Sequence, residues 1–167
     1  VLEESLIQDA MNGDSRHDFG HDIIPGLVKD GADVRIYDFS TNKIPGDPEE
    51  TAPYWRDVGT VDSYFQANME LRSPLPSLNM YNRQWRIRTA QRDYPPARVV
   101  QYGNRNTVNI VDSLICEGSI ISCDHLIKSL IGYDCFLHAY TQVENSIILS
   151  GCDIGARTRI NNVIMDK

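Results

Sequence analysis

The stretches Asp112-Ser-Leu-Ile115, Lys128-Ser-Leu-Ile131 and Asn145-Ser-Ile-Ile148 repeat one pattern, with copies beginning at residues 112, 128 and 145. Each period is 16 or 17 residues, and a fixed short period is typical of a solenoid whose coils stack on one another. Within each coil an aliphatic residue recurs about every six positions, which predicts a three-faced parallel β-helix built from hexapeptide repeats. The expected inward residues are Ile115, Ile121, Ile127, Ile131, Leu137, Val143, Ile148, Ile154 and Ile160.

The tight inner corners of this β-helix are also visible in the sequence. Four positions after the inward residues, the side chains are mostly small or aliphatic: Ser119, Cys135, Thr141, Ile147, Cys152, Thr158 and Ile164. His125 is the exception to this pattern. An irregular sandwich of short strands is the alternative, and the fixed period disfavours it.

Charge and composition limit the partners of this chain. The net charge of −7 over 167 residues argues against a nucleic acid or an anionic membrane surface as partner. Any phosphate binding must therefore be local. No apolar run approaches membrane-spanning length, and residues 1–20 lack a basic start followed by an apolar stretch. We therefore expect a cytoplasmic chain with no membrane anchor.

The four cysteines show no pattern of a metal site or a redox pair. They stand at positions 116, 123, 135 and 152, without a CxxC pair or zinc-binding spacing. Two of them, Cys135 and Cys152, fall on expected inner corners of the β-helix. We therefore predict reduced packing residues, as is usual in the cytosol.

Residues 1–96 show a different, mainly helical organisation. Helical spacing predicts a helix over 1–11 that ends at Asn12-Gly13, and a second helix, capped by Asp18 and closed by Gly31. Alternation predicts a strand over 34–39, and apolar spacing predicts a helix over 61–71. A polar, proline-containing loop is expected over 41–52, and an ordered linker over 74–96.

The segment Pro53-Tyr-Trp-Arg-Asp-Val-Gly-Thr60 combines an aromatic ring and a carboxylate two residues apart, ahead of Gly59. An indole face packs well on a sugar ring, and a carboxylate at a turn can bind Mg²⁺ while leaving room for phosphate oxygens. The alternative is structural, with Trp55 in the core and Asp57 as a helix cap. Thr60 and Asp62 are better placed for that cap.

Several motifs in one order resemble the C-terminal part of bacterial glucose-1-phosphate adenylyltransferase, also called ADP-glucose pyrophosphorylase. They are His17-Asp-Phe-Gly20, Asp22-Ile-Ile-Pro25, the segment 53–60, Tyr81-Asn-Arg83 with Trp85, Ile87-Arg-Thr89 and Pro95-Pro-Ala97. The resemblance spans essentially the whole chain. It implies the C-terminal part of a Rossmann-like nucleotidyltransferase (α/β) domain over 1–90, and a left-handed parallel β-helix over 95–167. The sequence departs from the family pattern at positions such as His21, where family members commonly have lysine. These positions are not among the residues expected to bind substrate.

The resemblance also implies an activity. Such an enzyme joins ATP and α-D-glucose 1-phosphate into ADP-glucose and pyrophosphate for glycogen synthesis, and it is assisted by Mg²⁺. By the family pattern, Asp57 is one of two metal-binding carboxylates, while Asp18, Phe19 and Trp55 belong to the glucose 1-phosphate pocket. From the residues alone, a helix cap for Asp18 and core packing for Phe19 and Trp55 remain open.

Further implications concern regulation and assembly. Family members tend to carry a basic residue at the position of Lys167, near a pocket for phosphorylated effectors, and they form homotetramers. The glycine-rich nucleotide loop that opens the family's catalytic domain does not occur in this sequence. The sequence therefore resembles one part of a longer enzyme. This part would be inactive by itself.

Two other functions are compatible with a β-helix. One is a non-catalytic regulatory or oligomerisation subunit of the same family, which the intact Asp18, Trp55 and Asp57 disfavour. The other is a hexapeptide-repeat acyltransferase, which would need a histidine base such as His125 or His138. That class gives no reason for the segment 53–60, and fold alone does not set function.

Overall fold

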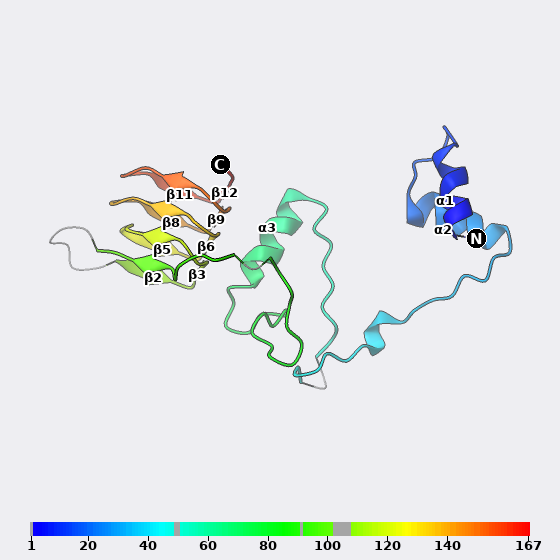
Figure 1. The fold of residues 1–167 in the computed structure, drawn as a ribbon, viewed down its shortest axis with the longest axis horizontal. Coiled ribbons are helices and arrows are strands. Elements are labelled where there is room, and N and C mark those ends of the chain that lie inside the picture. The colour runs from blue at the N-terminus through cyan, green and yellow to red at the C-terminus, as the bar shows by residue number, and fades with distance from the viewer. Residues whose placement is uncertain (1, 49–50, 91, 102–107) are drawn as a thin grey trace. The chain divides into compact units, whose positions relative to one another are not determined.

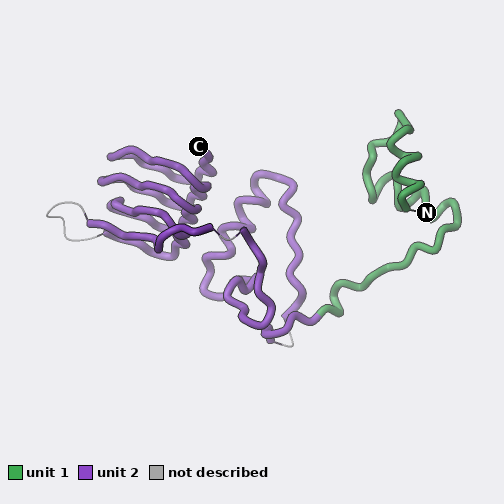
Figure 2. The backbone as a smooth tube through the Cα atoms, in the orientation of Figure 1, with its two compact units in different colours: residues 1–42 green, residues 43–167 purple. Residues whose placement is uncertain are grey.

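The computed structural model describes residues 2–48, 51–90, 92–101 and 108–167. The chain forms two compact units, residues 1–42 and residues 43–167, which Figure 2 shows in different colours. Among the described residues, none of the helices has both the length and the apolar character needed to cross a bilayer.

The unit 1–42 is built from short helices. Helix α1 spans Leu2–Ala10, a π-helical turn η1 spans Phe19–Ile23 and helix α2 spans Ile24–Lys29. Pro25 lies in the first turn of α2, where its missing N–H costs no helical bond. Gly31 follows with a φ of 76°, so it closes the helix as expected. The expected start of the first helix at Val1 lies outside the described residues.

The strand predicted over 34–39 is not formed. Residues 34–38 have no regular structure, and a 3₁₀ turn, η2, spans Phe39–Thr41. No strand is found among the described residues of this unit, so the alternating side chains have no sheet to pack on. Ile36, 96% exposed, shows that the alternating pattern buries nothing here.

The unit 43–167 begins with loops and one helix, α3, which spans Val61–Glu70. Thr60 is its N-cap and forms a capping box with Ser63, so the preference for Thr60 over Asp57 as the cap is confirmed. Ala67 and Met69 are buried on one face of the helix. The helix contacts strand β9 of the β-helix.

The C-terminal part is a β-helix of three parallel four-stranded sheets, whose stacked coils are seen edge-on in Figure 1. Sheet 1 contains β1 (Arg98–Val99), β4 (Ile120–Ile121), β7 (Phe136–Leu137) and β10 (Asp153–Ile154). Sheet 2 contains β2 (Asn109–Val111), β5 (His125–Ile127), β8 (Gln142–Glu144) and β11 (Arg159–Asn161). Sheet 3 contains β3 (Leu114–Ile115), β6 (Leu130–Ile131), β9 (Ile147–Ile148) and β12 (Ile164–Met165). The predicted parallel β-helix is therefore confirmed.

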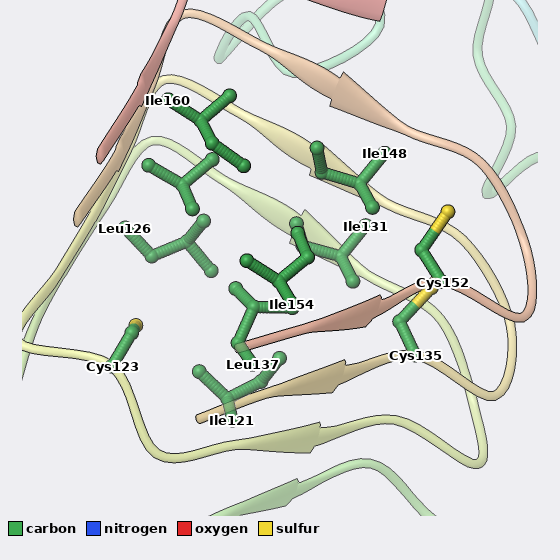
Figure 3. Close-up of a cluster of buried hydrophobic side chains, with 11 residues drawn as sticks. Ile121, Cys123, Leu126, Ile131, Cys135, Leu137, Ile148, Cys152, Ile154 and Ile160 are labelled. Atoms are coloured by element: carbon green, nitrogen blue, oxygen red, sulfur yellow. The ribbon is translucent and has the colours of Figure 1, made fainter. Parts of the chain in front are cut away.

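The core of the β-helix consists of columns of aliphatic side chains, one column for each sheet (Figure 3). Ile121, Leu137 and Ile154 pair in register in sheet 1, and Ile131 pairs with Ile148 in sheet 3. Parallel pairing places like residues above one another, so each coil buries its aliphatic side chains against the next. The predicted inner corners at Ser119, Cys135, Thr141, Ile147 and Cys152 are also buried.

One predicted inward residue is wrong. In β5 the fully buried side chain belongs to Leu126, which pairs with Val143, whereas Ile127 pairs with the exposed Glu144. Side chains alternate along a strand, so only the middle residue of His125–Ile127 points inward. Leu126 and Ile127 are adjacent and both aliphatic, so a strict count of six positions from Ile121 selects Ile127 and misses Leu126.

Candidate functional site

Asp18 is the N-cap of the η1 turn. Its Oδ1 accepts hydrogen bonds from the backbone N–H groups of Gly20 and His21, each at 2.8 Å. The bond from His21, followed by the bond from Gly20, lowers the pKa of this exposed carboxyl group. Asp18 therefore stays ionised, and the capping role left open by the sequence is observed.

The loop before Asp18 is tied to helix α1 through one carboxylate. Asp9 lies 2.8 Å from Nδ1 of His17 and accepts a hydrogen bond from the Ser15 hydroxyl at 2.6 Å. These contacts, that of Ser15 first, lower the pKa of Asp9. His17 itself has a φ of 57°, in the left-handed region, so the network holds an uncommon backbone conformation just before Asp18 and Phe19. Sequence reasoning missed this role for Asp9.

Phe19 and Trp55 do not pack in a core. Phe19 is 51% exposed and Trp55 is 72% exposed, so the core-packing interpretation of both rings is wrong for the structure described. An aromatic face left open in this way is available to stack on a sugar ring. Phe19 belongs to the unit 1–42, whereas Trp55 belongs to the unit 43–167.

Asp57 is exposed and its carboxylate is oriented by a local turn. Oδ1 accepts a hydrogen bond from the backbone N–H of Gly59 at 2.9 Å. A Cβ atom added to Gly59 would lie 3.1 Å from that oxygen, so the glycine permits a close approach of the carboxylate. Gly59 is not among the glycines with positive φ, so it provides space and not a left-handed turn.

The segment carrying Trp55 and Asp57 is held to helix α3 by an ion pair of Arg56, the residue that lies between these two. Nη2 of Arg56 lies 2.6 Å from Oε2 of Glu70, the last residue of α3. The Ser77 hydroxyl contacts the other carboxylate oxygen of Glu70. Ser77, followed by Arg56, lowers the pKa of Glu70, so the pair stays charged. This contact holds residue 56, which lies between Trp55 and Asp57, against the end of helix α3.

Asn82, from the Tyr81-Asn-Arg83 motif, is a buried tether between two loops. Its Nδ2 donates to the Pro45 carbonyl at 2.8 Å and to Asp47 at 3.1 Å. Its Oδ1 accepts from the backbone N–H groups of Gln84 and Trp85, at 2.9 and 3.0 Å. Residues 83–89, which follow this tether, line an open cavity of about 890 Å³ that carries three arginines. The acidic chain therefore has a local cationic surface.

In the described part of the chain, the candidate ligand for Mg²⁺ is the carboxylate of Asp57. Mg²⁺ prefers oxygen ligands and is usually bound by one or two carboxylates together with substrate phosphates. The exposed, oriented carboxylate of Asp57 fits one such position. No cluster of three or more His, Cys, Asp or Glu side chains suited to a metal is found among the described residues.

The candidate residues of the β-helix lie on its outer surface. His138 is paired with Asp153 at 2.7 Å and stacks on Phe136, with ring centroids 3.9 Å apart. Lys167 is exposed, and its side chain passes beside Gly151, where an added Cβ would lie 3.5 Å from Nζ. His125 is half-buried at the start of β5. Each of these positions is thus set by the stacking of coils.

The cysteines are free, as predicted, and three of the four are buried. Burial raises the pKa of Cys123 to about 11 and also raises the pKa values of Cys116 and Cys152. The thiols of Cys123 and Cys152 therefore stay protonated near neutral pH and behave as small apolar side chains.

Comparison with known proteins agrees with this two-part architecture. Residues 1–73 match the family model described as nucleotidyl transferase, and residues 95–167 match the model described as GlmU-like, C-terminal hexapeptide. The class defined by fold and matches is thus a nucleotidyltransferase segment followed by a hexapeptide β-helix.

Curated relatives narrow this class. The chain is 41% identical over 167 residues to glucose-1-phosphate adenylyltransferase 1 of Vibrio vulnificus (strain YJ016), covering 100% of this chain and 40% of the relative. It is 39% identical to glucose-1-phosphate adenylyltransferase of Cutibacterium acnes, with the same coverage, and 40% identical to that of Rhodopirellula baltica, covering 99% of this chain and 36% of the relative. Over all or nearly all of its length, the chain is therefore similar to glucose-1-phosphate adenylyltransferases. It spans about 40% of the length of the relatives it matches.

Proposed function

We propose that this chain is one part of an enzyme that transfers the adenylyl group of ATP to α-D-glucose 1-phosphate, giving ADP-glucose and pyrophosphate. The observation that carries the proposal is the segment 53–60, in which an exposed indole and an exposed, oriented carboxylate stand two residues apart. The named activity of relatives about 40% identical over the whole chain supports it.

The reaction suits a site without a strong base. An oxygen of the sugar phosphate, already anionic, attacks the α-phosphorus of ATP. The bond from that phosphorus to the bridging oxygen breaks, and pyrophosphate leaves with the electron pair. No proton has to be removed from the nucleophile, so catalysis rests on positioning and on neutralising phosphate charge.

Asp57 would hold Mg²⁺ through its carboxylate. The hydrogen bond from Gly59 fixes the direction of this group before any ligand arrives, which lowers the cost of ordering it. When bound, the metal supplies neutralisation of the phosphate oxygens. Glu70 and Arg56 would act as positioning residues, because their ion pair fixes the backbone beside Asp57.

Trp55, Phe19 and Asp18 would bind the sugar. The exposed rings offer apolar faces to the C–H groups of glucose, and the Asp18 carboxylate offers oxygens that accept hydrogen bonds from hydroxyl groups. Because Oδ1 of Asp18 already accepts two backbone hydrogen bonds, Oδ2 would be the sugar-facing oxygen.

Lys167 would bind phosphorylated effectors, in a cytoplasmic enzyme that assembles as a homotetramer. An ammonium group projecting from a rigid coil can attract a phosphate group even in an acidic protein. The observation in support is its position beside Gly151, together with its exposure.

The direct test is a pyrophosphate-release assay on the full-length enzyme with ATP, Mg²⁺ and α-D-glucose 1-phosphate. The proposal predicts release that depends on all three, with ADP-glucose formed in equal amount. Absence of turnover with these substrates, in a folded protein of the expected assembly, would instead support the regulatory-subunit alternative.

A further inference from the structure

One corner of the β-helix carries two arginines around an open cavity of about 380 Å³. The corner joins sheet 1 to sheet 2, and the cavity is lined by residues of three successive coils: Asp124, Tyr140, Gln142, Arg157 and Arg159. Small-molecule sites usually have volumes of roughly 300–1,000 Å³, so this cavity has room for a small ligand.

The backbone at this corner fixes the direction of Arg157. Tyr140 and Arg157 have φ values of 66° and 65°, so the same left-handed corner recurs in consecutive coils. The Arg157 N–H donates to the carbonyl of Ala139 at 3.1 Å, which ties the two corners together. The Arg157 guanidinium lies over the Tyr140 ring, with Cζ 5.5 Å from the ring centroid. This cation–π contact preorganises the guanidinium group at the mouth of the cavity.

Arg159 is placed by strand register. It is the first residue of β11 and pairs with Gln142, the first residue of β8. Neighbouring strands are about 4.8 Å apart, so the two side chains emerge side by side on one face of sheet 2. The lining therefore combines two guanidinium groups, an amide and a phenol against one carboxylate, that of Asp124. This gives a local positive charge on a chain with a net charge of −7.

We propose that this cavity binds the phosphate group of a small molecule. Guanidinium groups present planar, fixed donors that match the oxygens of phosphate in pairs, and the amide of Gln142 can donate a further hydrogen bond. The lining is mainly polar, which disfavours an apolar ligand. The cavity lies at the corner between sheets 1 and 2, whereas Lys167 follows β12 of sheet 3. The proposal therefore does not depend on the reaction or on the effector role of Lys167.

The test is calorimetric titration of the 167-residue chain with inorganic phosphate and, separately, with glycerol 3-phosphate. Two substitutions remove the cations with little change elsewhere. Arg157→Asn keeps a residue that tolerates the left-handed backbone, and Arg159→Gln keeps a polar side chain of similar reach. We expect saturable binding in the millimolar range, weakened about tenfold or more by each substitution. Tighter binding of glycerol 3-phosphate than of inorganic phosphate would identify a phosphomonoester as the ligand, and the reverse would identify the free ion.

Two control variants sharpen the result. Asp124→Asn removes the one carboxylate and should tighten phosphate binding, because repulsion of the anion is lost. Arg98→Gln removes another arginine at the first position of a strand, in sheet 1, and should leave binding unchanged. Absence of saturable heat from a chain that keeps its wild-type circular dichroism and melting transition would overturn the proposal. Equal affinity of the Arg157 and Arg159 variants and the wild-type chain would do so too.

Discussion

The hydroxyl oxygen of Ser129 accepts a hydrogen bond from the backbone nitrogen of Ser146, one coil further along, at 3.2 Å. The same hydroxyl donates to the carbonyl of Ile127 at 2.8 Å. Ser113 and Ser146 repeat the relationship toward Ser129 and Val163, each at 3.2 Å. The serine of each repeat therefore satisfies a backbone N–H that the turn between sheets 2 and 3 leaves without a strand partner.

We expect Ser129→Ala to destabilise the β-helix by about 1–3 kcal/mol, because a buried N–H loses its acceptor. Ser129 is fully buried, so water cannot replace the hydroxyl. Urea denaturation followed by circular dichroism measures the loss. Ser40→Ala is the control, since the Ser40 hydroxyl is hydrogen-bonded to Asp38 but exposed, and its loss should change stability by less than about 0.5 kcal/mol. Equal losses of stability for the two variants would show that the hydrogen bond accepted by the Ser129 hydroxyl does not stabilise the β-helix.

The register of β5 predicts unequal effects of two neighbouring truncations. Leu126→Ala should leave a cavity in the core and cost roughly 2–5 kcal/mol, because Leu126 is fully buried. Ile127→Ala should cost distinctly less, because its side chain is only half-buried on the outer face. Thermal melts of both variants decide the point. A larger melting shift for Ile127→Ala would contradict the register.

The repeat of the sequence predicts the β-helix well because a local period carries its information. The pattern fails at Leu126 and Ile127, where two adjacent aliphatic residues leave the inward one undetermined. The strand over 34–39 was predicted from alternation alone, but a strand also needs a partner, and the described part of unit 1–42 contains none.

Details of the candidate site depend on contacts that local sequence does not encode. Asn82 binds Pro45 and Asp47, which are 37 and 35 residues away along the chain. The Arg56–Glu70 pair joins a loop to the end of a helix, 14 residues apart. The motifs around Trp55 and Asp57 indicate the candidate site residues, whereas the contacts that support these residues are made by segments distant in the sequence.

Trp55→Ala in the full-length enzyme should raise KM for glucose 1-phosphate much more than KM for ATP, if the indole packs on the sugar. Asp18→Ser should do the same, and serine retains the helix cap, so lost binding is separated from lost capping. Steady-state kinetics with each substrate varied in turn checks both. Trp85→Ala, which truncates another exposed indole, is the control. Equal changes in the two KM values would argue against a sugar contact.

Lys167→Ala should raise the concentration of activator needed for half-maximal effect about tenfold, while basal activity stays unchanged. The reason is the loss of an ammonium group that a phosphate would pair with. Activator titrations compare the variant with the wild-type enzyme. Lys128→Asn, at another exposed lysine of the β-helix, should leave the curve unchanged. Superimposable curves for Lys167→Ala and wild type would make Lys167 an ordinary surface residue.

The most direct test of the account is the turnover rate of Asp57→Asn in the full-length enzyme at saturating Mg²⁺. Asparagine can still accept the hydrogen bond from Gly59, so the turn is preserved while the charge is lost. Asp62→Asn, five residues away and also exposed, controls for a general loss of negative charge. We predict that Asp57→Asn lowers kcat more than about a hundredfold while Asp62→Asn stays near wild type. A kcat for Asp57→Asn within about threefold of wild type would contradict the assignment of Asp57 to the metal-assisted step.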